Sequence, residues 1–532
     1  MISDADVHRG DRFERMLAAV ACALLLAGTG LFLIDGFRDR ISADAAVPLL
    51  LARRMLETGA LMPADWYYGN GDFWILGPQL FVLPFVAAWG VVPRALACGN
   101  ALGLVLLFAA AVALGRAVGA RWSTALIAAS LPVALFSHFQ REFVVVQLSY
   151  GLMAAKLMLT LAAAIAWLRA PPTDRIARVL LVAYAVLLGV WTAENPGRPL
   201  MYLVLPLAAA LALHAKAASR RAVVLAAATL IALGTGCTVR QRLLAHLQMV
   251  PGLDAFRFTA PGEWMSHVRW LFGGLRHLYG SDALGDPPAG FLAIVLALLR
   301  AAAVPAILLM AARASEPRGA IGARMPLATG AVGFVFIAAL LVVGNVMVDP
   351  VSDRYLMPSW LLALAGAAFA ASILPSWRWI AVLLVVAFPL GGLVNALGIR
   401  HAGSATDAAG LPRPPALDGV IAALRDLGVA RGFASHRYAN VLTVRSGASL
   451  DLCDVRFKPE PVPARWLDAE ACFDPARLRE GFFVLLAPDE RDAAHAAAIT
   501  ASIGTPSGMR EVDGYAIWVY QSDSASLTWL AR

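Results

Sequence analysis

The first polar loop of the chain contains the segment Ser42-Ala-Asp-Ala-Ala-Val-Pro-Leu-Leu-Leu-Ala-Arg-Arg-Met-Leu-Glu-Thr-Gly59. Its apolar residues recur at helical spacing, which predicts a helix lying flat on a membrane surface. Asp44 stands at the start of this helix, and two arginines stand near its end. A carboxylate held at a membrane surface beside cations can act as a base or metal ligand toward a lipid-borne substrate. We therefore expect chemistry at Asp44; the alternative is that Ser42 or Asp44 caps the helix start.

The composition of the 532-residue chain predicts its class. Hydrophobic residues make up 60% of the chain and charged residues only 15%, values far outside the range of soluble proteins. The first apolar stretch, 16–34, follows three arginines but has no clear small-residue cleavage site, and further apolar stretches come after it. We therefore expect an integral membrane protein that retains its first helix.

Apolar runs of about 18 or more residues predict eleven membrane crossings. A twelfth apolar stretch, 73–89, contains one glycine and two prolines. If it does not cross, the basic loops share the side of the basic N-terminus, as the positive-inside rule requires. We expect 73–89 to be a juxtamembrane or re-entrant helix, the N-terminus to be cytoplasmic, and loops 36–94 and 239–289 to face outward. The predicted crossings are 16–35, 95–114, 122–139, 147–168, 178–193, 199–214, 222–238, 290–312, 326–348, 356–373 and 378–399.

Residues 402–532 have a different pattern, with apolar runs of strand length at Phe482–Leu486 and Tyr515–Tyr520. They predict a small soluble α/β domain on the outer face, after a transmembrane domain at 1–401. With 13 Lys and Arg against 16 Asp and Glu, this second domain carries a net charge of −3, so residues 1–401 carry +11 of the total of +8. A basic excess in membrane loops suits anionic lipids or lipid phosphates as partners, rather than nucleic acid.

Two cysteines of the predicted outer domain, Cys453 and Cys472, lie nineteen residues apart. An oxidising compartment would allow a disulfide between them. Two unpaired thiols are the alternative, and the sequence does not distinguish the two.

Loop 36–94 also contains the segment Asp65-Trp-Tyr-Tyr-Gly-Asn-Gly-Asp72. The rings of Trp66 and Tyr67 suit stacking on pyranose faces, and carboxylates accept hydrogen bonds from sugar hydroxyls. Asp72 is the stronger candidate of the two acids, because the neighbouring glycines allow close approach of a ligand. The alternative is an interfacial belt of aromatic residues around a turn.

Three further outer loops place arginines and acids close to the membrane. Arginine offers a planar cation with several donors, which suits a phosphate. Ion pairs within the loops, such as Arg354 with Asp353 or Asp349, are the alternative. The three segments are Arg141-Glu142, Glu194-Asn-Pro-Gly-Arg198 and Asp353-Arg354-Tyr355.

The order of these features resembles the GT-C superfamily of polyprenyl-phosphate-sugar glycosyltransferases. The nearest branch is the group of protein mannosyltransferases and lipid A aminoarabinose transferases. Asp44 and the helix ending at Gly59 match the Asp-Glu motif of the family, although the second acid is Ala45 here. Glu142 stands near the position of the acid in the family's second outer loop. Arg354-Tyr-Leu-Met-Pro358 matches the motif Arg-Tyr-Leu-x-Pro.

The resemblance implies an inverting sugar transfer at the outer face of a bacterial inner membrane. Asp44 would act as general base, and Glu142 would position a substrate or share a divalent metal ion with Asp44. Arg354, helped by Arg198 or Arg53, would stabilise the departing lipid phosphate. The remaining candidate substrate-binding residues are Trp66, Tyr67, Asp72, Arg141 and Tyr355. The implied partners are a polyprenyl-phosphate-linked sugar donor, membrane lipids, and a lipid, glycan or protein acceptor.

Two other classes of protein stay open. A transporter or lipid flippase would need charges within the membrane, and Lys156 and Arg300 fall in predicted spans. For both residues, an internal ion pair or snorkelling explains the position equally well. A catalytically silent protein that binds an envelope glycan is the second alternative, since a fold does not establish an activity.

Overall fold

The computed structural model describes residues 4–171, 175–214, 220–250, 257–280, 291–313, 322–347, 349, 351–401, 417–458, 460–521 and 525–531. The chain forms two compact units. The first comprises 1–36, 101–242 and 254–403, and the second comprises 37–100, 243–253 and 404–532. The second unit therefore contains most of the first predicted outer loop as well as the predicted α/β domain.

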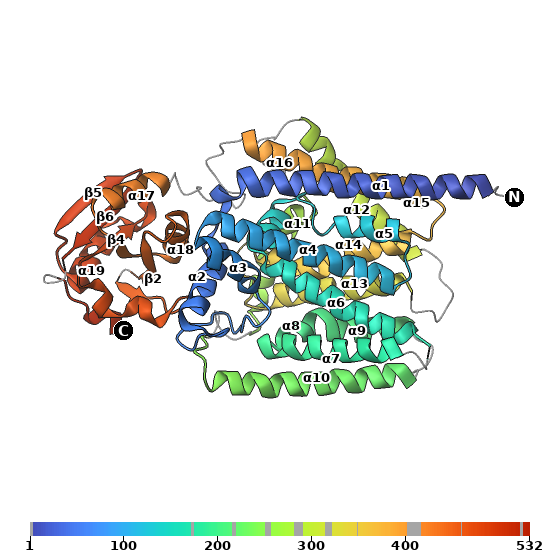
Figure 1. Ribbon diagram of the computed structural model, residues 1–532, viewed down its shortest axis with the longest axis horizontal. Helices are drawn as coiled ribbons and strands as arrows, with labels where there is room; N and C mark the ends of the chain where they lie inside the picture. Colours follow the sequence, from blue (N-terminus) through green and yellow to red (C-terminus); the bar gives the residue numbers. More distant parts are fainter. Residues whose placement is uncertain are drawn as a thin grey trace. The chain divides into compact units, whose positions relative to one another are not determined.

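The first unit is helical (Figure 1). Its helices are α1 (Asp4–Leu31), α4 (Pro93–Ala117, from residue 101 onward), α5 (Trp122–Ser130), α6 (Ser149–Arg169), α7 (Arg175–Glu194), α8 (Gly197–Pro199), α9 (Leu205–His214), α10 (Arg220–Leu244), α11 (Pro261–Tyr279), α12 (Phe291–Arg313), α13 (Arg324–Val343), α14 (Met357–Ala371), α15 (Trp377–Val385) and α16 (Gly391–His401). Short irregular helical segments join several of them, including η1 (Phe32–Gly36), η3 (Gln140–Val146), η4 (Leu200–Val204), η6 (Ser352–Leu356) and η7 (Val386–Leu390).

Seven helical segments among the described residues are long and apolar enough to cross a membrane, so the chain is a multi-pass membrane protein. They are Asp11–Gly36, Pro93–Ala117, Ser149–Arg169, Arg175–Glu194, Arg220–Leu244, Arg324–Val343 and Trp377–Gly398. The number of eleven crossings stays a prediction, because some of the expected spans contain helices shorter than the roughly 20 residues that a crossing needs. Helix α5 has 9 residues and α14 has 15. Helix α5 ends at Ser130, two residues before Pro132.

Small residues allow helices of the first unit to approach closely. A Cβ at Gly330 of α13 would overlap the backbone of Ala363 in α14, and contacts of this kind are common between membrane helices. Helices α7 and α10 lie side by side (Figure 1), and the hydroxyls of Tyr184 and Thr229 are 2.7 Å apart between them.

The second unit is built around a six-stranded mixed sheet with the strand order β3-β2-β1-β4-β6-β5. Strand β1 pairs in parallel with β2 and β4, and the other pairs are antiparallel. The strands are β1 (Arg431–Ala434), β2 (Asp451–Phe457), β3 (Pro461–Pro463), β4 (Phe482–Leu486), β5 (Gly508–Val512) and β6 (Tyr515–Tyr520), and the helices are α2 (Ala43–Thr58), α3 (Gln79–Trp89), α17 (Leu417–Asp426), α18 (His436–Arg445) and α19 (Ala493–Ile503). Both strands predicted from the sequence are thus confirmed, with the predicted bounds.

The sheet has an apolar cluster on each face, because side chains alternate along each strand. In β4, Phe483 and Leu485 join a cluster with α17 and α18. Phe482, Val484 and Leu486 join the opposite cluster, which includes residues of α19. The sheet therefore supplies a core of its own to the second unit.

Helix α3 has 11 residues, a length of about 16 Å. The hydrocarbon core of a bilayer is about 30 Å thick. The length of α3 agrees with the prediction that 73–89 does not fully cross.

A disulfide joins Cys453 of β2 to Cys472, with the two Cα atoms 5.7 Å apart. The structure thus favours the bonded pair over two separate thiols. The disulfide holds the segment around 470 against β2, next to the residues described below.

Candidate active site

Helix α2 holds Asp44 at its first turn without using it as the cap. The side chain of Ser42 accepts a hydrogen bond from the backbone N–H of Ala45 at 3.4 Å, so Ser42 is the N-cap. Gly59 ends the helix with φ +67°, a left-handed conformation that glycine adopts readily. A carboxylate in the first turn is favoured by the helix dipole. The Asp44 side chain is therefore available for interactions outside its own helix.

Asp44 belongs to a chain of three polar side chains in the second unit. The ring of His436, the first residue of α18, places Nε2 3.2 Å from Oδ1 of Asp44 and Nδ1 2.8 Å from Oδ2 of Asp454 on β2. The side chains of Asp44, His436 and Asp454 are 55%, 26% and 2% exposed. The hydrogen-bonded series Asp44–His436–Asp454 thus connects a half-exposed carboxylate to a buried one.

Trp466 and Gly69 shape the surroundings of the imidazole. The rings of His436 and Trp466 lie 4.7 Å apart. A Cβ at Gly69 would overlap the Trp466 indole. The glycine therefore leaves the space that the indole occupies beside His436.

The electrostatics favour an imidazolium at this position. Burial alone would lower the pKa of His436, but its hydrogen bonds to Asp44 and Asp454 outweigh burial and raise the pKa from 6.5 to about 10. Burial raises the pKa of Asp454, and the neighbouring His436 opposes that rise. At neutral pH the imidazolium can therefore donate a hydrogen bond to each carboxylate. The contact with His436 orients the Asp44 carboxylate toward the ring.

The segment predicted to suit a sugar is only partly exposed. Trp66 is buried, and Asp72 is 5% exposed. Asp65 accepts a hydrogen bond from Nε of Arg54 at 2.9 Å, and the backbone N–H of Tyr67 bonds to the carbonyl of Asp468. Much of this segment thus packs against the α/β part of the unit.

Arg53 also has protein partners. Its Nη2 lies 3.2 Å from Oδ1 of Asp451, and its Nε lies 3.5 Å from Glu57 one turn along α2. The role of Arg53 as a helper for a lipid phosphate stays a prediction, and its observed partners are acids of the second unit.

The other predicted site residues lie in the first unit. Arg354 pairs with Asp349 at 3.7 Å, one of the two partners considered from the sequence, and its guanidinium lies over the rings of Phe143 and Tyr355. Arg141 contacts the ring of His138 at 2.7 Å. The carboxylate of Glu142 accepts a hydrogen bond from Gln147 at 3.2 Å, and the backbone N–H of Arg198 bonds to the carbonyl of Asn195.

The charges predicted within membrane spans are satisfied by the protein. Lys156 forms an ion pair with Glu194. Arg300 donates to the carbonyl of Gly280 through Nε, at 3.1 Å, and to the carbonyl of Ala387 through Nη1, at 3.0 Å. Internal pairing therefore accounts for both residues without a role in transport.

Among the described residues, one group of acids, histidines or cysteines is close enough to hold a metal ion. This group is Cys453, Asp468 and Cys472, but the disulfide takes up both sulfur atoms. A cation held by Asp44 and Glu142 stays a prediction.

His436 and Asp454 are the residues that the sequence did not reveal. His436 is 392 positions from Asp44 along the chain. The only local signal is a histidine at the start of a helix that follows a short strand, and this pattern by itself does not predict a partner.

The structure is similar to that of ArnT from Cupriavidus metallidurans. For ArnT bound to undecaprenyl phosphate, the TM-score is 0.54 and the identity 15%, over 96% of this chain and 98% of ArnT. For ArnT in the apo state, the TM-score is 0.56 and the identity 13%, over the same shares. The oligosaccharyltransferase of Archaeoglobus fulgidus with Zn and sulfate gives a TM-score of 0.49 and 12% identity, over 90% of this chain and 69% of that one. No protein-family model and no curated protein sequence matches the chain. The similarity to ArnT confirms the GT-C-like fold that the sequence resemblance predicts.

Proposed function

We propose that the protein is a glycosyltransferase that moves a sugar from a polyprenyl-phosphate donor to an acceptor hydroxyl at the outer face of the bacterial inner membrane. The fold shared with ArnT over 96% of the chain supports this class, and one ArnT structure contains undecaprenyl phosphate. The observation that carries the proposal is the half-exposed carboxylate of Asp44, held by His436 in the first turn of α2. Most of the apolar side chains of α2 are buried within the protein, so they do not form the membrane-facing surface that the sequence predicts.

The proposed reaction is a single displacement with inversion. The acceptor oxygen forms a bond to the anomeric carbon of the donor sugar, while the bond from that carbon to the phosphate oxygen breaks. The bonding electrons leave with the lipid phosphate, and the acceptor proton moves to Asp44. Because a carboxylate must point at this proton within about 3 Å, the hydrogen bond from His436 would act by orientation. An imidazolium makes its partner carboxylate a weaker base, so we assign His436 a positioning role.

The lipid phosphate that departs needs cations to stabilise its charge. We propose Arg354 for this role, with Arg198 as a helper, since arginine forms paired hydrogen bonds with phosphates. Glu142, Arg141 and Tyr355 are proposed to contact the substrates, as are Trp66, Tyr67 and Asp72. The roles of Glu142, Arg354 and Tyr355 rest on the sequence resemblance, and those of Trp66, Tyr67 and Asp72 rest on side-chain types that suit a sugar.

The test is mass spectrometry of glycolipids and envelope glycans from cells that express the wild type, Asp44→Asn or no protein. We expect a sugar-sized mass increment with the wild type, and a loss of roughly 100-fold or more in Asp44→Asn, the lower end of what general base catalysis contributes. Asp489→Asn is the matched control, because Asp489 is an exposed aspartate of the same unit. All variants are compared at equal membrane expression.

Equal product from the wild type and Asp44→Asn would remove Asp44 as the base and leave its contact with His436 as a structural one. No increment in any strain would favour transport or silent glycan binding over transfer.

A further inference from the structure

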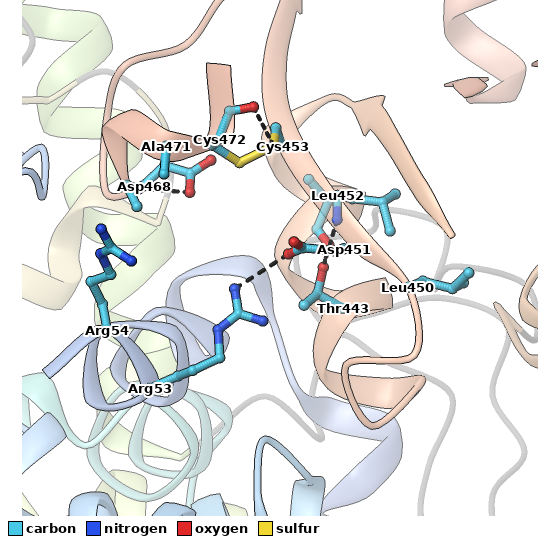
Figure 2. A network of polar contacts seen from close by, with 12 residues as sticks. Arg53, Arg54, Thr443, Leu450, Asp451, Leu452, Cys453, Asp468, Ala471 and Cys472 are labelled. Carbon is cyan, nitrogen blue, oxygen red and sulfur yellow. Dashed lines mark hydrogen bonds and ion pairs between the residues drawn. A yellow bond between two sulfur atoms is a disulfide. The ribbon is translucent and has the colours of Figure 1, made fainter. Parts of the chain in front are cut away.

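A cavity of about 260 Å³ lies within the second unit. Residues of α2, of β2 and of the segment 468–477 line it, together with Trp66 and with Thr443 of α18. Figure 2 shows its polar network, in which the Arg53 guanidinium points toward the Asp451 carboxylate. Of the residues that line it, the proposed transfer assigns a role only to Trp66.

The lining of the cavity contains equal numbers of basic and acidic residues. The three arginines are Arg53, Arg54 and Arg477, and the three acids are Glu57, Asp451 and Asp468. One carboxylate links two of the arginines: Asp451 accepts from Arg53 through Oδ1 and from Arg477 through Oδ2. Arg54 pairs with Glu57 at 2.8 Å. The cavity is therefore strongly polar but has little net charge.

This charge balance argues against an ionic ligand. A phosphate would meet the carboxylates of Glu57 and Asp451, and a metal ion would meet three guanidinium groups. Like charges at such distances cost binding energy in a partly buried site. A ligand with neutral hydroxyl groups meets no such penalty, because each hydroxyl can donate to a carboxylate and accept from a guanidinium.

The size and the remaining lining agree with a single sugar ring. Pockets for drug-sized ligands begin at about 300 Å³, slightly above the volume found here. Each guanidinium carries five N–H donors in a rigid fork. This number exceeds the hydrogen bonds to the carboxylates named above. The indole of Trp66 adds an apolar surface to the lining.

We infer that this cavity is a binding site for one neutral pyranose unit, held through its hydroxyls by Arg53, Arg477 and Asp451. The site goes beyond the proposed transfer, since it binds a sugar without any reaction. It also gives Arg53 a partner other than a lipid phosphate.

The experiment measures sugar binding by the full-length protein in nanodiscs, with methyl glycosides of glucose, galactose, mannose and N-acetylglucosamine as probes. Saturation-transfer NMR is the readout, and inorganic phosphate is the competing probe. We expect a Kd on the order of 1 mM for at least one glycoside, as for a small ligand held by a few hydrogen bonds. The measurement uses no donor lipid, so its result is independent of the Asp44→Asn comparison in cells.

The blocking variant is Ala471→Leu, which puts a larger side chain into the cavity wall. Its matched control is Ala476→Leu, an exposed position five residues further along. We expect Ala471→Leu to weaken binding at least tenfold and Ala476→Leu to leave it unchanged. Arg53→Lys keeps the charge but removes the planar fork, so it should weaken binding about fivefold or more even if Ala471→Leu fails to fold.

Three results would overturn the inference. One is the absence of binding by all four glycosides at ten times the expected Kd. Another is equal binding by the wild type, Arg53→Lys and a folded Ala471→Leu. The third is displacement of the glycoside by phosphate at equal concentration, which would assign the cavity to an anion.

Discussion

The Asp44–His436 contact predicts a measurable change in the pKa of one histidine. Two unit charges about 4 Å apart interact with about 1 kcal/mol in water and about 4 kcal/mol near a protein surface. Asp44 is 55% exposed, so we expect a value near the lower limit, roughly 1–2 kcal/mol. Since 1.36 kcal/mol corresponds to one pH unit, Asp44→Asn should lower the pKa of His436 by about one unit from its value of about 10.

The buried partner should have the larger effect. Asp454 is 2% exposed and 2.8 Å from the ring, so its interaction lies near the 4 kcal/mol limit. Asp454→Asn should therefore lower the pKa of His436 by about two to three units. Comparing the size of the two pKa changes tests the orientation of the His436 ring, because each ring nitrogen faces a different carboxylate.

The assay is NMR titration of the full-length protein with labelled histidine. The chain has nine histidines, and His436→Gln identifies the resonance of interest. The reasoning would be refuted by a His436 pKa below 6.5 in the wild type, or by an Asp44→Asn variant with an unchanged pKa. Either result would mean that α2 does not place Asp44 against this ring.

The sign of the linked stability follows from the same contact. The folded-state pKa of His436 lies above its ordinary value of 6.5. The stabilisation is therefore complete below pH 6.5 and is lost as pH rises through about 10. We expect the wild type, but not His436→Gln, to lose stability in thermal unfolding between pH 8 and pH 10.

Three further predictions concern the same unit. Replacing both Cys453 and Cys472 by serine should destabilise it by about 3 kcal/mol, the chain-entropy estimate for a loop of this length, measured as faster proteolysis of the native protein. Burial raises the pKa of Asp468 to about 7, so the wild type should lose stability as pH rises from about 4 through 7, and Asp468→Asn should flatten this dependence in thermal unfolding. Gly69→Ala should cost about 1–3 kcal/mol by overlap with Trp466, with a shifted His436 resonance; an unshifted resonance would contradict the packing.

The local features of the fold could be predicted from the sequence. Phe482–Leu486 and Tyr515–Tyr520 form strands with the predicted bounds, because short apolar runs between turn residues carry a local signal. The short helix at 79–89 was expected from two prolines and the charge of the loops. These inferences need only neighbouring residues and the bilayer thickness.

Of the Asp44–His436–Asp454 series, only Asp44 could be predicted from the sequence. The sequence singles out Asp44 as a carboxylate close to two arginines in the first outer loop, but its partner depends on how α18 packs against α2. Arg53 looked suitable for a phosphate, whereas its neighbour in space is Asp451, 398 positions away. Polar pairs that are distant in sequence leave no periodic pattern. The sequence therefore shows which residues are charged but not which residues pair with one another.

The separation of Asp44 and His436 along the chain has a consequence for biosynthesis. The proposed base emerges early in translation, and its orienting partner follows 392 residues later. At about 5–20 residues per second, that interval is roughly 20–80 s. Throughout it, a nascent chain already inserted in the membrane would carry an unoriented carboxylate. Catalytic competence would then begin only after the C-terminal sheet has been translocated and folded, so incomplete chains would remain inert.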